Sequence, residues 1–331
     1  MAQIAQQRAP GVRLLTFLVT SLALVSLAGL EQTARVGGAG LTANAQERRP
    51  SALAALWQRK LAPGAGTVES LATDPRGKGR ALLCQGGVVW LSRDEGRSFA
   101  PVFKSDSEQG VTAAFHPTEP ATLFLATNRR LLVSADGGKD WTVPEPGLKF
   151  KWRPRAILIS NEAPNRIYIT TRGEGIYRSD DGGHTWSAIN SGLPESNGAA
   201  PIAPIESAVL DPTDPEVAYA APETNGVYKT TDGGATWTRA SQGLPGLITH
   251  GTYPWVLAID PANPQRLLVW AHWPVHSERV TSAFFLSEDG AVSWRKVAAA
   301  DQGRVLAIQF VEAKDGLAVA ITEDGVMRLA N

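Results

Sequence analysis

Four glutamates in predicted loops could supply acid–base chemistry. They are Glu174, Glu206, Glu223 and Glu278. Two facing carboxylates at a set separation, one of them with a raised pKa, can act as general acid and general base in the hydrolysis of a glycosidic bond. The sequence places no two of them together, so a solvated loop charge is the simpler interpretation of each.

Aromatic and basic residues on the same predicted loops could bind a ligand instead. The most distinctive stretch is 271–279, AHWPVHSER, which is the longest of these loops. A long, decorated loop on a rigid scaffold is where binding usually resides. The residues predicted to bind are Trp152, Arg153, Arg155, Tyr253, Trp255, His272, Trp273, His276 and Arg304.

Metal and nucleophile chemistry are weakly supported. The spacing of His272 and His276 would suit a metal on a helix, but Pro274 interrupts it and no third ligand is apparent. We therefore expect no metal site and no cofactor. Cys84 lies in an apolar run and is expected to be part of the core rather than a nucleophile.

The elements that would position these residues are indicated by an eight-residue pattern, S/T-x-D-x-G-x-T-W, that occurs in five copies of varying fidelity, 42 to 57 residues apart. Its Asp can accept hydrogen bonds from amides of its own turn, its Gly can take the positive φ of a hairpin turn, and its Trp can cover the next strand. Ala291 replaces the second Gly in the fifth copy, which leaves the turn geometry there open. The residues predicted to be structural are Ser92, Asp94, Gly96, Ser134, Asp136, Gly138, Trp141, Ser179, Asp181, Gly183, Trp186, Thr230, Asp232, Gly234, Trp237, Ser287, Asp289 and Trp294.

A second pattern, D-P-x-x-P or a variant, lies between the boxes at residues 115–120, 210–215 and 259–264. Each copy separates two β-rich runs, as a proline-rich strand connection should. In the third unit this predicts strands at 156–160, 166–171, 175–178 and 186–189. Four short strands in roughly 40–50 residues is the period of a β-propeller blade.

These boxes and proline turns, together with Gly-Leu-Pro at 192–194 and 243–245, resemble Asp-box (BNR) repeat β-propellers over residues 54–331. That group includes sialidases and xyloglucanases, which are enzymes, and sortilin-like receptors and photosystem II assembly factors, which bind other proteins. The repeats resemble those of xyloglucanases and assembly factors most. The resemblance implies the fold far better than the function.

The resemblance leaves two functions open. No Arg-Ile-Pro signature of a sialidase precedes the first box. Xyloglucanases use two propellers with the substrate cleft between them, and this chain has room for one. We therefore expect a monomeric, non-catalytic module that binds a protein or a glycan, like an assembly factor. The alternative is a sialidase-like or xyloglucanase-like glycoside hydrolase that uses Glu206, Glu278, Glu174 or Glu223.

The expected fold is all-β: a six-bladed propeller of four-stranded antiparallel blades, with seven blades as the fallback. The Asp boxes would form the hairpins between the third and fourth strands. After the fifth box the chain supplies three strands of a sixth unit, and residues 54–61 look like its missing fourth strand. Pairing of the two chain ends would leave no open edge strand.

The first 45 residues are predicted to be an export segment. Two arginines precede the apolar run 14–30, and Ala43-Asn44-Ala45 offers a cleavage site. Without cleavage the segment would be an N-terminal membrane anchor; in both cases the propeller lies outside the cytoplasm. Residues 46–53 would form a linker, and 54–331 a single domain.

Composition excludes several classes. The 32 basic and 32 acidic residues give a net charge of zero, which argues against a nucleic-acid binder and against other polyanionic partners. One cysteine allows no intramolecular disulfide. The 32 Gly and 22 Pro beside 43% hydrophobic residues fit many turns between buried strands.

Overall fold

The computed structural model describes residues 66–196, 198–245, 253–276, 279–299, 305–313, 316–322 and 325–329. Within these ranges every regular element is a β-strand. The same ranges contain no helix long and apolar enough to cross a membrane. The predicted export segment, the linker and the closing strand at 54–61 lie outside the described residues.

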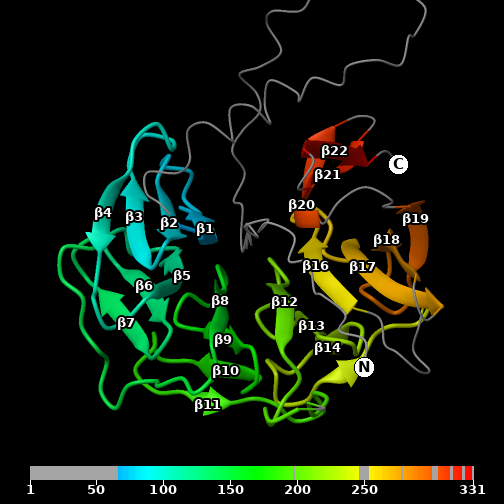
Figure 1. Ribbon diagram of the computed structural model, residues 1–331, viewed down its shortest axis with the longest axis horizontal. Helices are drawn as coiled ribbons and strands as arrows, with labels where there is room; N and C mark the ends of the chain where they lie inside the picture. Colours follow the sequence, from blue (N-terminus) through cyan, green and yellow to red (C-terminus); the bar gives the residue numbers. More distant parts are fainter. Residues whose placement is uncertain are drawn as a thin grey trace, which may run out of the picture.

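The described strands form six antiparallel sheets that follow one another along the chain (Figure 1). The first contains β1 (Val68–Thr73), β2 (Ala81–Gln85), β3 (Val88–Ser92) and β4 (Ala100–Phe103). The second contains β5 (Gly110–Phe115), β6 (Leu123–Thr127) and β7 (Leu131–Ser134). The third contains β8 (Pro154–Ile159), β9 (Ile167–Thr171), β10 (Ile176–Ser179) and β11 (Ser187–Ala188).

The remaining three sheets continue the same order. The fourth contains β12 (Ile205–Leu210), β13 (Ala218–Pro222), β14 (Tyr228–Thr230) and β15 (Thr238–Arg239). The fifth contains β16 (Tyr253–Ile259), β17 (Leu267–His276), β18 (Arg279–Ser287) and β19 (Arg295–Ala299). The sixth contains β20 (Val305–Ala313), β21 (Gly316–Thr322) and β22 (Gly325–Leu329).

The first strands of successive sheets lie next to one another, in the order β1, β5, β8, β12, β16 and β20. The sheets are therefore arranged around a common axis, with their first strands innermost and the first and sixth sheets at the two ends of the arc (Figure 1). Because all pairs are antiparallel, the turns before each first strand and after each second strand lie at one end of the sheets, hereafter the loop end. The Asp boxes lie at the opposite end.

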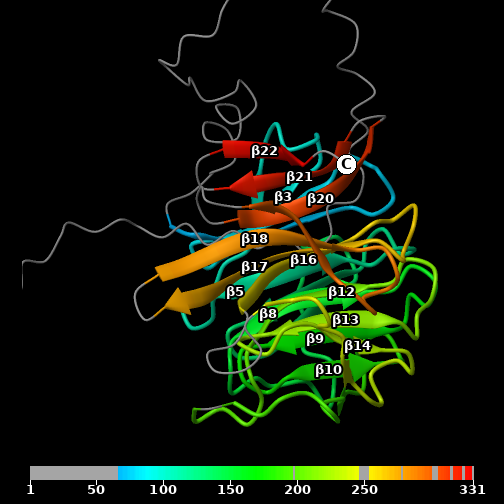
Figure 2. The ribbon, with the colours of Figure 1, turned by 90° about the vertical axis from the view of Figure 1, so that its right-hand side faces the viewer.

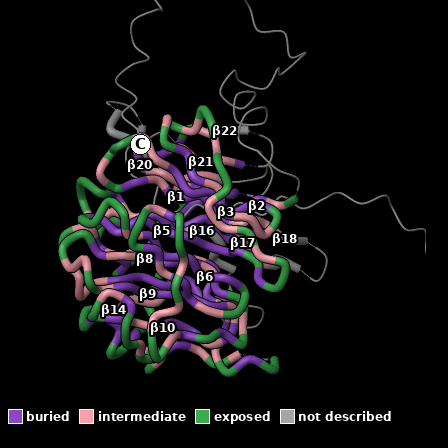
Figure 3. The backbone as a smooth tube through the Cα atoms, turned by 90° about the vertical axis from the view of Figure 1, so that its left-hand side faces the viewer, coloured by how far each residue is buried: buried purple, intermediate pink, exposed green. Residues whose placement is uncertain are grey.

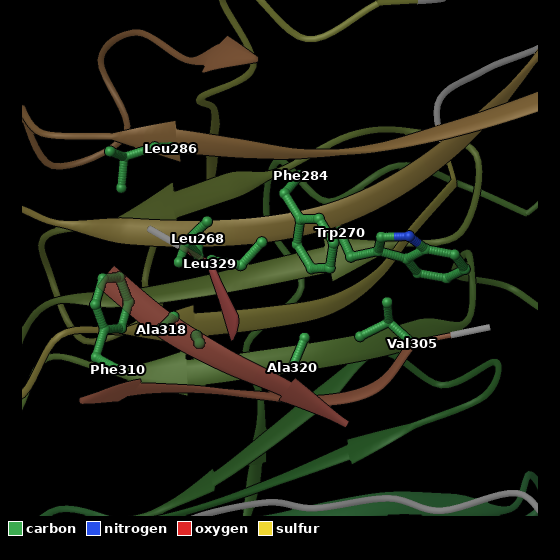
Figure 4. Packing of buried hydrophobic residues seen from close by; sticks show 10 residues of the cluster. Leu268, Trp270, Phe284, Leu286, Val305, Phe310, Ala318, Ala320 and Leu329 are labelled. Carbon is green, nitrogen blue, oxygen red and sulfur yellow. The ribbon is translucent and has the colours of Figure 1, made fainter. Parts of the chain in front are cut away.

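The core lies between neighbouring sheets. One cluster joins Leu268, Trp270 and Phe284 of the fifth sheet to Phe310 and Leu329 of the sixth (Figure 4). Burial of each such side chain contributes about 1.5–3 kcal/mol. Figure 3 shows the buried residues running along the strands, while the exposed ones concentrate in turns. Packing of apolar faces therefore fixes the spacing of the sheets and, with it, the positions of the loop-end residues.

The box turns share one hydrogen-bond pattern. In the third copy Ser179 Oγ donates to Asp181 Oδ1 (2.8 Å), and the Gly183 amide donates to Ser179 Oγ (2.8 Å). Both the amide and the hydroxyl of Thr185 donate to Asp181 (2.8 and 2.6 Å). In the fourth copy the equivalent bonds, that of the Thr236 hydroxyl foremost, lower the pKa of Asp232 to about 2. These carboxylates are engaged in holding their own turns.

The box tryptophans form hydrogen bonds backward along the chain. The indole N–H groups of Trp141, Trp237 and Trp294 donate to the carbonyls of Val102, Ile189 and Ala240, each at 2.8 Å. Each acceptor lies in or beside the last strand of the preceding sheet. Trp186 instead donates to Gly183 of its own turn (2.9 Å). In the sheet before it, the bridge Val133↔Thr142 replaces the predicted fourth strand.

The Gly-Leu-Pro motif belongs to the same seam between sheets. The Trp237 amide donates to the Ser191 carbonyl (2.8 Å), and Gly192 follows with φ 88°. A Cβ at Gly192 would lie 2.1 Å from the Trp237 carbonyl oxygen. Only glycine therefore lets the two backbones approach this closely.

The fifth box keeps the common geometry despite its alanine. Ala291 adopts φ 67°, and its amide donates to Ser287 Oγ at 2.8 Å, as Gly183 does to Ser179. The question left open by the sequence is thus answered: Ala291 takes the left-handed conformation.

Candidate functional site

A β-bulge recurs near the start of the innermost strand in each of the six described sheets, at the second residue in five of them and at the third in β16. Glu69 is the extra residue between the paired positions Val68 and Ser70 of β1. The equivalent residues are Val111, Arg155, Glu206, Trp255 and Leu306. A bulged residue is released from cross-strand pairing, which allows its side chain to be re-aimed. The six bulges thus occupy one level at the loop end, and three of them carry charge.

Glu206 is the most deeply buried charge of this group, with 1% of its side chain exposed. Arg172 Nη2 donates to Glu206 Oε1 (3.0 Å). Arg155 Nη2 lies 3.0 Å from Oε2 without hydrogen-bond geometry, while Arg155 Nε donates to the Glu206 backbone carbonyl (3.2 Å). The two guanidinium groups offset the cost of burying this carboxylate.

Glu223 lies beside this buried carboxylate. It follows β13, and its amide donates to the Pro204 carbonyl just before β12 (2.8 Å). Burial raises the pKa of Glu223, the negative charge of Glu206 raises it further, and Arg172 opposes the rise. A carboxyl group with a raised pKa that remains partly exposed is suited to donate a proton.

A second ion pair links distant units at the same level. Arg153 Nη2 lies 2.7 Å from Glu69 Oε2, with 40% and 26% of the two side chains exposed. Arg153 precedes β8 of the third sheet, whereas Glu69 belongs to β1 of the first. Glu69 was not identified from the sequence. Alignment of the innermost strands by their second residues would have placed it with Arg155 and Glu206.

Glu174 and Trp152 lie beside these charged residues. Glu174 Oε2 accepts hydrogen bonds from the amides of Lys151 and Trp152, both at 3.1 Å. A Cβ at Gly173 would lie 2.6 Å from Trp152 Cδ2, so the half-buried indole packs directly on that glycine. Glu174 therefore holds the backbone that carries Trp152.

In the stretch 271–279, which was predicted to be a loop, the described residues instead belong to two long paired strands, β17 and β18. Figure 2 shows these two strands extending beyond their neighbours. Pro274 did not break the strand, because it pairs with Val280 near the end of these two strands. Trp273 packs edge-to-face on Phe285, with ring centroids 5.6 Å apart, and His272 packs on Trp270 at 5.8 Å. Both rings thus contact the sheet itself.

The structure describes the other predicted site residues only in part. Tyr253 and Trp255 lie on β16 and His276 ends β17, and only their backbone is described. Arg304 and Glu278 lie outside the described residues. Cys84 is fully buried, as expected, and burial raises the pKa of its thiol to about 12. Among the described residues, no group of three or more His, Cys, Asp or Glu side chains could hold a metal ion.

Comparison with known proteins bears on fold and function. The Sortilin-Vps10 family model (Sortilin, neurotensin receptor 3) matches residues 174–324. An oligoxyloglucan reducing-end-specific xyloglucanase of Emericella nidulans is 25% identical over 286 residues, which cover 69% of this chain and 34% of that protein. A xyloglucanase of Paenibacillus is 29% identical over 182 residues, covering 44% of this chain and 17% of that protein. The chain thus spans about a third or less of these relatives' lengths.

A solved structure gives the same indication for the fold. The GH74 enzyme of Niastella koreensis matches with a TM-score of 0.62 at 20% identity, covering 78% of this chain and 44% of that one. The resemblance to Asp-box propellers expected from the repeats is confirmed. The expectation of a non-catalytic, assembly-factor-like scaffold is wrong, because the curated relatives that match are xyloglucanases.

Proposed function

We propose that this protein is a glycoside hydrolase that acts on a polysaccharide of the β-glucan type, and that Glu223 is its general acid. The observation that carries the proposal is the placement of a partly exposed carboxyl group, Glu223, beside buried Glu206 at the loop end, where burial and the charge of Glu206 raise the pKa of Glu223. The xyloglucanase relatives support the reaction class.

The proposed reaction gives each charged group one task. Protonated Glu223 donates its proton to the glycosidic oxygen as the bond to the anomeric carbon breaks. Glu69, the partly exposed carboxylate of the first sheet, accepts a proton from the water that forms the new bond. Glu206 does not reach the substrate; its charge raises the pKa of Glu223, and Arg155 and Arg172 keep Glu206 in place.

The same proposal includes a closed six-bladed ring formed by residues 54–331. Five apolar clusters each join two successive sheets. The sixth, Val68, Leu71, Ala81 and Leu83 with Trp90 and Phe99, lies on the first sheet alone. Packing of the sixth sheet on this face, with 54–61 as its fourth strand, would complete the ring. The predicted export segment agrees with a substrate outside the cytoplasm.

The test is hydrolysis of xyloglucan, unsubstituted β-glucans and a β-glucan that carries uronic acid residues, measured as the release of reducing sugar. Glu223→Gln should lower kcat at least roughly 100-fold, since general acid catalysis typically contributes that much or more. The matched control is Glu162→Gln, an exposed glutamate in a turn at the Asp-box end, which should retain full activity. A wild-type protein that releases no sugar from any of these substrates, or an active Glu223→Gln protein that unfolds like the wild type, would refute the proposal.

A further inference from the structure

We propose that a strip of basic side chains beside the candidate site binds the carboxylate groups of uronic acid residues in the polysaccharide. The basic strip consists of Arg129, Lys149, Lys151, Arg153 and Arg172. The inference deepens the proposed function, because it names an acidic polysaccharide as the substrate class.

The strip is built on residues 149–155, KFKWRPR, which lead into β8. Side-chain exposure alternates along it: Lys149, Lys151 and Arg153 are exposed, whereas Phe150 and Pro154 are buried. Phe150 belongs to the apolar cluster that joins the second and third sheets. Burial of the alternate residues thus directs successive cations toward the same surface.

Backbone contacts bring the remaining cations to this segment. Lys149 pairs with Arg130 across an isolated bridge, and the Phe150 amide donates to the Arg129 carbonyl (2.7 Å). On the other side, the Arg172 amide donates to the Arg153 carbonyl (2.9 Å). Turns of the second and third sheets therefore line both sides of the segment, and the strip leads from Arg129 toward Glu206 and Glu223.

Most of this positive charge is not neutralised within the described chain. The side chains of Lys149 and Lys151 form no hydrogen bond or ion pair with another described residue, and Arg129 interacts electrostatically with Glu108 without forming an ion pair. Arg153 and Arg172 each direct one terminal nitrogen at a glutamate, with 40% and 42% of their side chains exposed. Since a guanidinium group carries five N–H donors, both arginines retain donors for a ligand.

The chemistry favours a carboxylate-bearing sugar. Guanidinium groups bind carboxylates through paired hydrogen bonds, and lysines add a less directional charge. Trp152 lies within the strip, half-buried on Gly173. An aromatic ring at this place is suited to contact a sugar, as the neighbouring cations are suited to bind its carboxylate. A nucleic acid is less suited, because the strip is confined to one side of the loop end and does not extend along the molecule.

The experiment measures binding separately from turnover. A glucuronic acid oligosaccharide and the same oligosaccharide after reduction of its carboxyl groups would be titrated into the full-length protein by calorimetry. The acidic form should bind at least roughly tenfold more tightly, a difference of about 1.4 kcal/mol. Lys149→Gln/Lys151→Gln should abolish most of that preference and reduce its salt dependence.

The matched control is Lys78→Gln/Lys139→Gln, which removes the same charge at the Asp-box end and should bind like the wild type. Equal binding of the two oligosaccharides, equal losses in both double variants, or tighter binding of a single-stranded DNA of the same charge would overturn the inference. Uronate binding without hydrolysis would support the inference about the basic strip and refute the proposed function. Hydrolysis of neutral β-glucans without uronate binding would do the reverse.

Discussion

Glu95 occupies a position of the Asp box that the other copies give to glycine. Its φ is 62°, and the four glycines have φ between 67° and 78°. A residue with a Cβ in the left-handed conformation costs roughly 1–2 kcal/mol. Replacement by glycine removes this cost, but glycine also increases the chain entropy of the unfolded state, which offsets part of the gain. Glu95→Gly should therefore raise the free energy of unfolding by about 0.5–1 kcal/mol, measured by urea denaturation.

Glu95→Ala is the control for this prediction. It removes the exposed ion pair with Arg97, which contributes little, but it keeps the Cβ. A gain from alanine as large as that from glycine would show that the side chain, and not the backbone conformation, was responsible.

His116 takes the place of aspartate in a proline turn. Its Nδ1 accepts hydrogen bonds from the amides of Thr118 (3.3 Å) and Glu119 (3.0 Å), as Asp211 accepts from Thr213 and Asp214. Burial lowers the pKa of His116; the charge of Glu119 opposes this, and that of Arg76 adds to it. The folded state therefore favours the neutral ring, which leaves Nδ1 able to accept.

Stability should consequently be lost as the pH falls. A histidine titrates near 6.5 in the unfolded chain, so the contribution of neutral His116 is complete above that pH and decreases below it. His116→Asp should remove this decrease between about pH 7 and pH 5, because a carboxylate stays charged there. Melting temperatures of both proteins across this range provide the measurement, and parallel profiles would contradict the assignment.

At the scale of elements, the seam between sheets is the most sensitive feature. Gly192→Ala would add a Cβ 2.1 Å from the Trp237 carbonyl at a positive φ, and should destabilise the protein by about 2–4 kcal/mol. Gly77→Ala is the control: Gly77 has φ 65° but nothing lies within 4 Å of the added atom. Gly77→Ala should destabilise the protein only through the left-handed conformation of the new alanine, by about 1–2 kcal/mol. Equal losses in denaturation experiments would mean that the close approach contributes nothing.

Strand positions followed from the sequence where turns are strongly marked. In the third unit the four predicted strands fall within about two residues of β8, β9, β10 and β11. The missing fourth strand of the second sheet was not anticipated, although Pro144 and Pro146 lie just after Thr142. Proline has no amide hydrogen, so that segment forms a single bridge instead of a ladder.

At the scale of the whole molecule, the candidate site depends on long-range proximity that local patterns do not encode. Arg155, Arg172 and Glu206 come from three separate strands or turns, and Glu69 meets Arg153 across two sheets. The sequence predicted that such residues would lie in the turns at one end of the units. It could not pair them, because pairing depends on the rotation between successive sheets. Likewise, a net charge of zero conceals a basic strip, because charge is distributed unevenly around the axis.

The repeated bulge separates the choice of side chain from the pairing of strands, two properties that are coupled in most sheets. A residue within a ladder must suit its cross-strand partners, whereas Glu69, Val111, Arg155, Glu206 and Leu306 each lack a paired residue. The chain therefore offers one position per unit at which side-chain chemistry can change while strand register is preserved. Substrate preference in a propeller of this kind could diverge one unit at a time, without refolding the scaffold that carries it.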